Sequence, residues 1–77
     1  MEREVFLKEL GRQIAKWRRK KKISQRELAF RCDVDKPSIT RIERGNTNPT
    51  SITLQKLSEA LNVPISSFFS FQKKDIF

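Results

Sequence analysis

The sequence contains no histidine, one cysteine (Cys32) and only two glycines, Gly11 and Gly45. Without histidine the chain cannot form a Ser-His-Asp or Cys-His catalytic set, and a single cysteine excludes a disulfide framework and a Cys/His zinc site. Two isolated glycines exclude a glycine-rich phosphate loop. No apolar run approaches the roughly 20 residues that a membrane span needs. These absences predict a binding protein, not an enzyme, with no cofactor and no metal.

The beginning of the chain and its length narrow the class further. The first ten residues, MEREVFLKEL, lack the layout of a signal peptide, and one free thiol suits a reducing compartment. We therefore expect a cytoplasmic, nucleoid-associated protein that does not bind a membrane. At 77 residues there is room for one core. We expect a folded domain over residues 1–70 and a tail over residues 71–77.

Positive charge is concentrated in one segment. The chain has 17 Lys and Arg against 9 Asp and Glu, and residues 12–22 hold seven of the bases and no acid. Such a cluster is typical of a surface that neutralises phosphates, and we assign Lys20 to phosphate contact on this basis. The alternative is a solvated helix end, whose basic last turn also suits the helix dipole.

Apolar spacing and capping residues predict an all-α chain with no strand. Ser24 followed by Glu27 is a capping-box signature, in which the Ser hydroxyl accepts from the Glu amide and the Glu reaches back. Asp35 and Thr50 are further N-cap candidates. Gly45 can end a helix with positive φ, and Asn62 can end one in a left-handed conformation. The five predicted segments are 3–21, 25–32, 36–44, one from Thr50 to Asn62, and 65–69.

The same spacing predicts a small core, with Gly11 at a point of close packing between helices. The expected core residues are Leu10, Ile14, Trp17, Ile23, Leu28, Ala29, Val34, Ile39, Ile42, Leu54, Leu57, Leu61, Val63, Ile65 and Phe68. Two short helices, 25–32 and 36–44, are joined by a link too short for them to lie antiparallel. This is the arrangement of a helix-turn-helix, whose second helix enters the DNA major groove.

Four short motifs at fixed spacing resemble the phage-repressor-type (Cro-like, XRE) helix-turn-helix family. They are Ser-Gln-x-x-Leu-Ala from Ser24, Ile-x-x-Ile-Glu-x-Gly from Ile39, Asn48-Pro49, and Leu-x-x-Leu from Leu54, and the resemblance covers residues 6–69. It implies a compact five-helix repressor-like DNA-binding domain. The implied function is a sequence-specific transcriptional regulator, usually a repressor, acting on double-stranded DNA and often as a homodimer on a near-palindromic site.

The outward side and first turn of segment 36–44 carry the candidate base contacts, since Ile39 and Ile42 face the other way. Arg41 is the strongest candidate, because its fork can donate two hydrogen bonds to guanine; the alternative is a phosphate-only role. Pro37 replaces the polar residue common in the family, which puts hydrogen-bonded readout there in doubt. The candidate base-contacting residues are Lys36, Pro37, Ser38, Thr40 and Arg41.

The resemblance also implies phosphate contacts and one internal ion pair. Family members place a Gln near the DNA backbone at the start of the second helix and contact phosphates with the loop after the third. The residues that match are Gln25, Arg44, Asn46, Thr47 and Asn48. A first-helix Arg pairs inside the family's domain with the Glu of the third helix, which here are Arg18 and Glu43. The alternative is an exposed Glu43. Asp33 stands where many relatives have Gly in a left-handed turn.

The end of the chain is aromatic, and we expect a dimer interface there from Phe68, Phe69 and Phe71. The alternative is that Phe68, with or without Phe69, fills the core while the tail frays. Two other functions remain open. One is an antitoxin-type protein that binds a toxin partner and regulates its own gene through the same domain. The other is nonspecific binding of membrane or RNA by residues 12–22, which Trp17 on the core stripe disfavours for a membrane.

Overall fold

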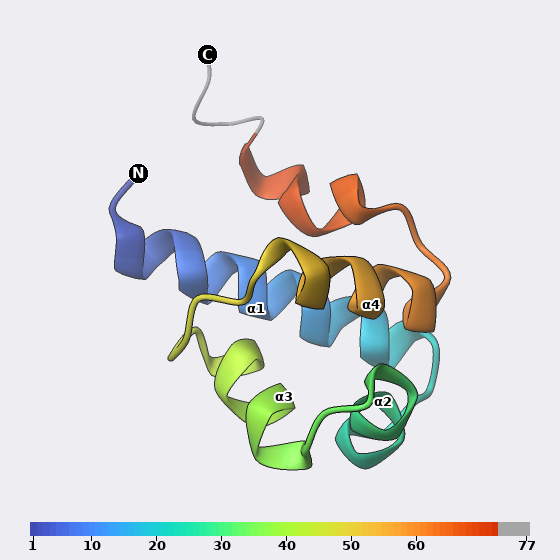
Figure 1. Cartoon of the computed structure of the whole chain (residues 1–77). Coiled ribbons are helices and arrows are strands. Elements are labelled where there is room, and N and C mark those ends of the chain that lie inside the picture. Colours follow the sequence, from blue (N-terminus) through green and yellow to red (C-terminus); the bar gives the residue numbers. More distant parts are fainter. Residues whose placement is uncertain (73–77) are drawn as a thin grey trace.

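Five helices make up the computed structural model, which describes residues 1–72. They are α1 (Arg3–Lys20), α2 (Gln25–Cys32), α3 (Lys36–Arg44), α4 (Ser51–Leu61) and the 3₁₀ helix η1 (Ile65–Gln72), and no strand occurs among these residues. In Figure 1, α2 and α3 lie on one side of the long α1, and η1 lies on the other. The predicted all-α, five-helix fold class is confirmed.

The helix starts agree with the predicted caps. The Ser24 hydroxyl accepts from the Glu27 amide (3.0 Å), and the Thr50 hydroxyl accepts from the Thr53 amide (3.1 Å). The predicted return bond of the capping box is not formed, because the Glu27 carboxylate instead accepts from Arg31 Nε (3.0 Å), its neighbour one turn along the helix. A single cap bond is therefore enough to fix the start of α2.

Left-handed residues directly follow three of the four α-helices. Asp33 (φ 57°), Gly45 (φ 76°) and Asn62 (φ 55°) follow α2, α3 and α4 as predicted. Lys22 also has positive φ (58°) just after α1, which the sequence did not indicate. A residue with a Cβ adopts this conformation at a cost of roughly 1–2 kcal/mol, so the end of α1 is strained.

The core draws on every helix. Ile14, Leu28, Leu57 and Phe68 have no exposed surface, and the buried set also includes Leu10, Ala15, Ala29, Cys32, Ile39, Ile42, and Leu61. Ile65 was predicted to be buried, but 41% of its surface is exposed; Phe68, three residues later, is the side chain of η1 that is fully buried. The boundary predicted after residue 70 falls inside η1, and residues 73–77 of the predicted tail lie outside the described residues.

Helices α1 and α3 touch at Gly11. A Cβ on Gly11 would lie 2.3 Å from the carbonyl oxygen of Ile42 and 2.6 Å from that of Glu43, distances that no side chain tolerates. The glycine predicted to mark close packing does so, and it sets how near α3 lies to α1. Within residues 1–72, no helix has both the length and the apolar character needed to cross a bilayer.

Candidate nucleic-acid interface

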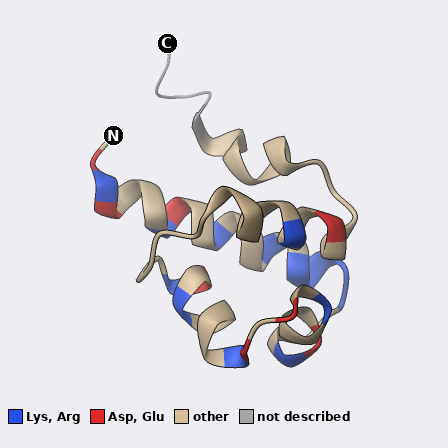
Figure 2. Cartoon of the chain, in the orientation of Figure 1, with Lys and Arg blue, Asp and Glu red and all other residues tan. Residues whose placement is uncertain are grey.

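Helix α3 has two unlike sides. Ile39 and Ile42 are buried, whereas Lys36, Pro37 and Arg41 are exposed, and so is Arg44 in the last turn. Figure 2 shows basic residues at both ends of the α3 ribbon. The side that the core does not use therefore presents the residues predicted to face DNA.

Arg41 is held by hydrogen bonds within α3. Its Nη2 donates to Ser38 Oγ (3.2 Å), and the Ser38 hydroxyl donates to the N-cap carboxylate of Asp35. The Ser38 hydroxyl bond lowers the pKa of Asp35 below its ordinary 3.8, with smaller contributions from the Ser38 amide and the Arg41 charge; desolvation opposes them. The half-buried Ser38 hydroxyl thus joins Arg41 to Asp35, and its predicted contact with a base stays a prediction.

The other flank of α3 is joined to α1 by an ion pair with two hydrogen bonds. Arg18 Nε donates to Glu43 Oε2 (2.6 Å) and Arg18 Nη2 donates to Glu43 Oε1 (3.0 Å). A third bond runs from Arg18 Nη1 to the carbonyl oxygen of Ile23 (2.9 Å). The two charged side chains are only 11% and 5% exposed. This is a planar, two-point contact of the kind that fixes orientation as well as distance.

Gln25 extends this pair to the surface of α3. Its Nε2 donates to Glu43 Oε1 (2.9 Å), and its Oε1 accepts from the Thr40 hydroxyl (2.9 Å). We call Arg18, Gln25, Thr40 and Glu43 the inner network; it ties the start of α2 and the second half of α3 to the end of α1. Gln25 keeps one amide N–H for a phosphate, and Thr40, whose hydroxyl hydrogen is donated to Gln25, can offer a base its methyl group and an acceptor oxygen.

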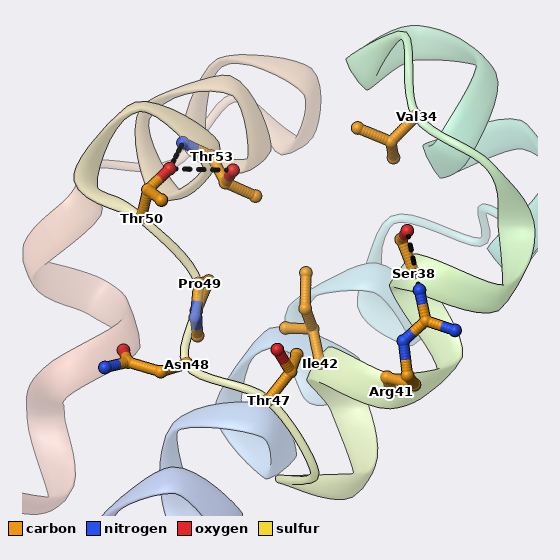
Figure 3. Close-up of a pocket in the computed structure, with 9 residues that line it drawn as sticks. All are labelled: Val34, Ser38, Arg41, Ile42, Thr47, Asn48, Pro49, Thr50 and Thr53. Atoms are coloured by element: carbon orange, nitrogen blue, oxygen red, sulfur yellow. Dashed lines mark hydrogen bonds between the residues drawn. The ribbon is translucent and has the colours of Figure 1, made fainter.

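A hollow of about 200 Å³ lies between α3 and the start of α4 (Figure 3). It brings Arg41 and Ser38 together with Thr47 and Asn48 of the following loop, as the predicted interface requires; Asn46 is exposed but does not line it. Its lining also includes Val34, Ile42, Pro49, Thr50 and Thr53. The sequence analysis missed Thr50 and Thr53 as surface candidates, although the capping position of Thr50 could have indicated them.

Lys20 lies over the indole ring of Trp17, and its predicted contact with a phosphate stays a prediction. Its ammonium lies 5.0 Å from the centroid of the Trp17 ring, a cation–π contact. Its neighbour Arg19 projects about 100° away around the helix and, with Arg44, lines a second hollow between α1 and α3. Lys8 and Arg12 line the same hollow. Sequence analysis did not single out these three cations of α1, although their spacing of four and seven residues places them on one stripe.

The predicted dimer surface is wrong at Phe68. It has no exposed area, so a second copy cannot contact it without unfolding the chain. Phe69 and Phe71 are half-buried, and their ring centroids lie 6.1 and 5.6 Å from that of Phe6. Phe69 and Phe71 thus pack η1 against α1.

Cys32 is buried, and burial raises the pKa of its thiol, so it packs as a small apolar residue. Among residues 1–72, no three His, Cys, Asp or Glu side chains cluster in a way that could hold a metal ion.

Comparisons with known proteins agree on one family. A family model described as helix-turn-helix (HTH_3) matches residues 14–68. The chain is 39% identical over 54 residues to the HTH-type transcriptional regulator y4dJ of Sinorhizobium fredii, covering 70% of each chain. It is 32% identical to the control protein C.MunI of a Mycoplasma species, covering 84% of this chain and 89% of that protein.

A solved structure extends the match to three dimensions. The restriction-modification controller protein C.AhdI of Aeromonas hydrophila superposes with a TM-score of 0.80 at 30% identity, covering 82% of this chain and 96% of that one. None of these relatives is named as an antitoxin, so the antitoxin alternative gains no support from them.

Proposed function

Because the chain belongs to the helix-turn-helix family (HTH_3), we propose that it is a sequence-specific DNA-binding transcriptional regulator whose α3 enters the major groove. The observation that carries this proposal is the division of α3 into a buried side and an exposed side with Lys36, Pro37 and Arg41. The inner network fixes the angle of α3, so the exposed side chains approach a base edge from a rigid support.

Arg41 is the principal base-reading residue in this proposal. Its bond to Ser38 orients the guanidinium before DNA arrives, which lowers the entropy cost of forming two bonds to one guanine. Lys36 at the first position of α3 reads a base or holds a phosphate, and Pro37 offers only an apolar contact. Thr40 presents its methyl group to a thymine.

Contacts with phosphates on either side of the DNA major groove hold the domain in register. Gln25 faces one strand from the start of α2, and Arg44 reaches the backbone from the last turn of α3. The hollow shown in Figure 3 faces the other strand with Thr47 and Asn48, next to Asn46. These contacts position the domain without reading sequence.

A homodimer on a near-palindromic site completes the proposal, with two α3 helices one DNA turn, roughly 34 Å, apart. Helix η1 supports a self-contact because it has no charged residue and leaves Ile65 41% exposed (Figure 2). Ile65→Asp should shift the protein to monomer in sedimentation equilibrium while it stays folded. Phe30→Asp, at an 81% exposed site on α2, is the matched control and should leave the dimer intact.

The relatives named as controllers of restriction-modification support a finer proposal, that this chain regulates genes of such a system. A regulator of this kind acts where its DNA is, so we propose a cytoplasmic, nucleoid-associated location.

Selection of bound duplexes from a random pool at about 150 mM salt tests the function directly. Enrichment of a near-palindrome with half-sites about ten base pairs apart is the expected result. Binding that disappears with salt and enriches no sequence would contradict sequence-specific regulation, and would leave only nonspecific affinity.

A further inference from the structure

Four basic side chains surround the hollow between α1 and α3. It has a volume of about 320 Å³; Lys8, Arg12 and Arg19 line it from α1, and Arg44 lines it from α3. Ala15 and Glu43 complete the lining. We call this hollow the basic groove. All four basic residues are exposed, so their charges are available to a ligand from solvent.

The acids near the basic groove leave most of its charge uncompensated. Glu43 lines it, but its carboxylate is 5% exposed and already bound by Arg18 and Gln25. Glu9 pairs with Arg12. Within residues 1–72, no acidic side chain forms an ion pair with the three remaining cations, Lys8, Arg19 and Arg44.

The basic groove is continuous with the exposed side of α3. Arg44 belongs to both, because it lies one helical turn beyond Arg41. The backbones of the two walls are in close contact: a Cβ on Gly45 would lie 2.6 Å from Lys8 Cα. Lys8 and Arg19 are eleven residues apart on α1, which corresponds to roughly 16 Å along the helix.

We propose that the basic groove binds backbone phosphates of the DNA strand beside the base pairs that α3 faces. Three of its cations, Lys8, Arg12 and Arg19, follow one stripe of α1, and Arg44 lines the same hollow from α3, so that together they present a row of positive charge to a strand beside α3. The inference rests on the proposed DNA binding but not on sequence-specific reading, since phosphate contacts are made to any duplex.

The test is the salt dependence of binding to a duplex of arbitrary sequence, between about 50 and 200 mM salt. Lys8→Gln and Arg19→Gln should each reduce the slope of log affinity against log salt by about one and weaken binding several-fold. Arg3→Gln is the matched control: it removes the same charge from an exposed position of α1 that lies about 140° around the helix from Lys8 and does not line the groove, and should leave the slope unchanged. Thermal unfolding of each variant checks that the fold is intact.

Two outcomes would overturn the proposal. One is a slope that Lys8→Gln and Arg19→Gln leave unchanged, or that Arg3→Gln reduces equally. The other concerns a second source of phosphate: if ATP raises the melting temperature of the wild type but not of Arg19→Gln, and the duplex slopes stay equal, the groove binds a small phosphate ligand and not DNA.

Failure of the proposed function gives a different pattern. If the random-pool selection enriches nothing while the slopes still fall for Lys8→Gln and Arg19→Gln, the groove proposal stands and sequence-specific regulation does not. If a palindrome is enriched and the slopes are unchanged, the reverse holds.

Discussion

Arg18 and Arg19 are neighbours of the same type, yet they lie in regions of opposite character. Arg18 is 11% exposed and bound within the inner network, whereas Arg19 is exposed and lines the basic groove. The step of about 100° per residue separates them, so one faces Glu43 and the other faces solvent. The basic segment 12–22 is therefore not a single surface: Arg18 supports the fold, whereas other cations of the segment, such as Arg19, are available for phosphates.

Removing Arg18 should have the largest effect on the stability of the fold. Arg18→Ala leaves Glu43 with its charge buried and uncompensated, and should lower the free energy of unfolding by about 3–5 kcal/mol. Arg19→Ala, the control one residue away, should change it by less than about 0.5 kcal/mol. Urea denaturation measures both, and equal losses would show that the ion pair has no structural role.

Gly11→Ala should have the second largest effect on stability, because it pushes apart α1 and α3, the helices that the inner network joins. Helix propensity alone favours alanine by about 1 kcal/mol. The Cβ would however meet two backbone carbonyl oxygens of α3, so we expect a net loss of about 1–3 kcal/mol. A stabilised variant in the same urea experiment would mean that α1 and α3 are not in close contact.

Arg41→Ala should separate the reading of bases from the binding of phosphates. Discrimination at one base pair of the selected site should fall by about 1–3 kcal/mol, since one paired contact to a base is lost. Arg19→Gln should instead weaken selected and arbitrary duplexes alike. Competition binding with point-substituted duplexes compares the two, and an equal loss on all sequences for Arg41→Ala would remove it from readout.

Lys22→Gly changes the chain just after α1, the helix that carries both Arg18 and Arg19. Lys22 has φ 58°, a conformation that glycine adopts without strain, so the variant should be more stable by about 0.5–1 kcal/mol. Lys21→Gly, at the preceding right-handed position, should be neutral or destabilising. Paired melting curves decide this, and destabilisation by Lys22→Gly would contradict the strain.

The smallest effect should be a pH dependence from Asp35. The pKa of its carboxyl is lowered in the folded chain, chiefly by the Ser38 hydroxyl, so this carboxylate stabilises the fold above its ordinary pKa of 3.8. That contribution is lost as the pH falls through the lowered pKa. Between about pH 5 and pH 3, the melting temperature of the wild type should fall more than that of Asp35→Asn. Parallel falls would exclude Asp35 as a source.

Local signals were sufficient to predict most of the fold. Ser24, Asp35 and Thr50 cap the helices in the structure, and Asp33, Asn62 and Gly45 end them, because each acts on its own few residues. Lys22 gave no such signal, since lysine has no preference for positive φ. Its conformation follows from the path of the chain, where the Ile23 amide bonds back to the carbonyl of Arg18.

The candidate site was less predictable because it depends on which side chains find one another. Helical spacing placed Arg41 outside and Ile42 inside, but not the bond that holds Arg41 to Ser38. The resemblance implied the pair of Arg18 with Glu43, whereas the basic groove needed the position of α1 beside Arg44. A count of charges along the chain could not separate Lys20, which lies over Trp17, from Arg19.

Trp17 gives the molecule an optical property of its own. It is the only tryptophan in a chain without tyrosine, so near-ultraviolet excitation of the indole reports on a single place. That place is half-buried against the core, directly before Arg18, with the Lys20 ammonium over its ring. Emission from Trp17 should therefore change when α1 separates from the core or when Lys20 moves, and the protein can be followed by fluorescence without an attached label.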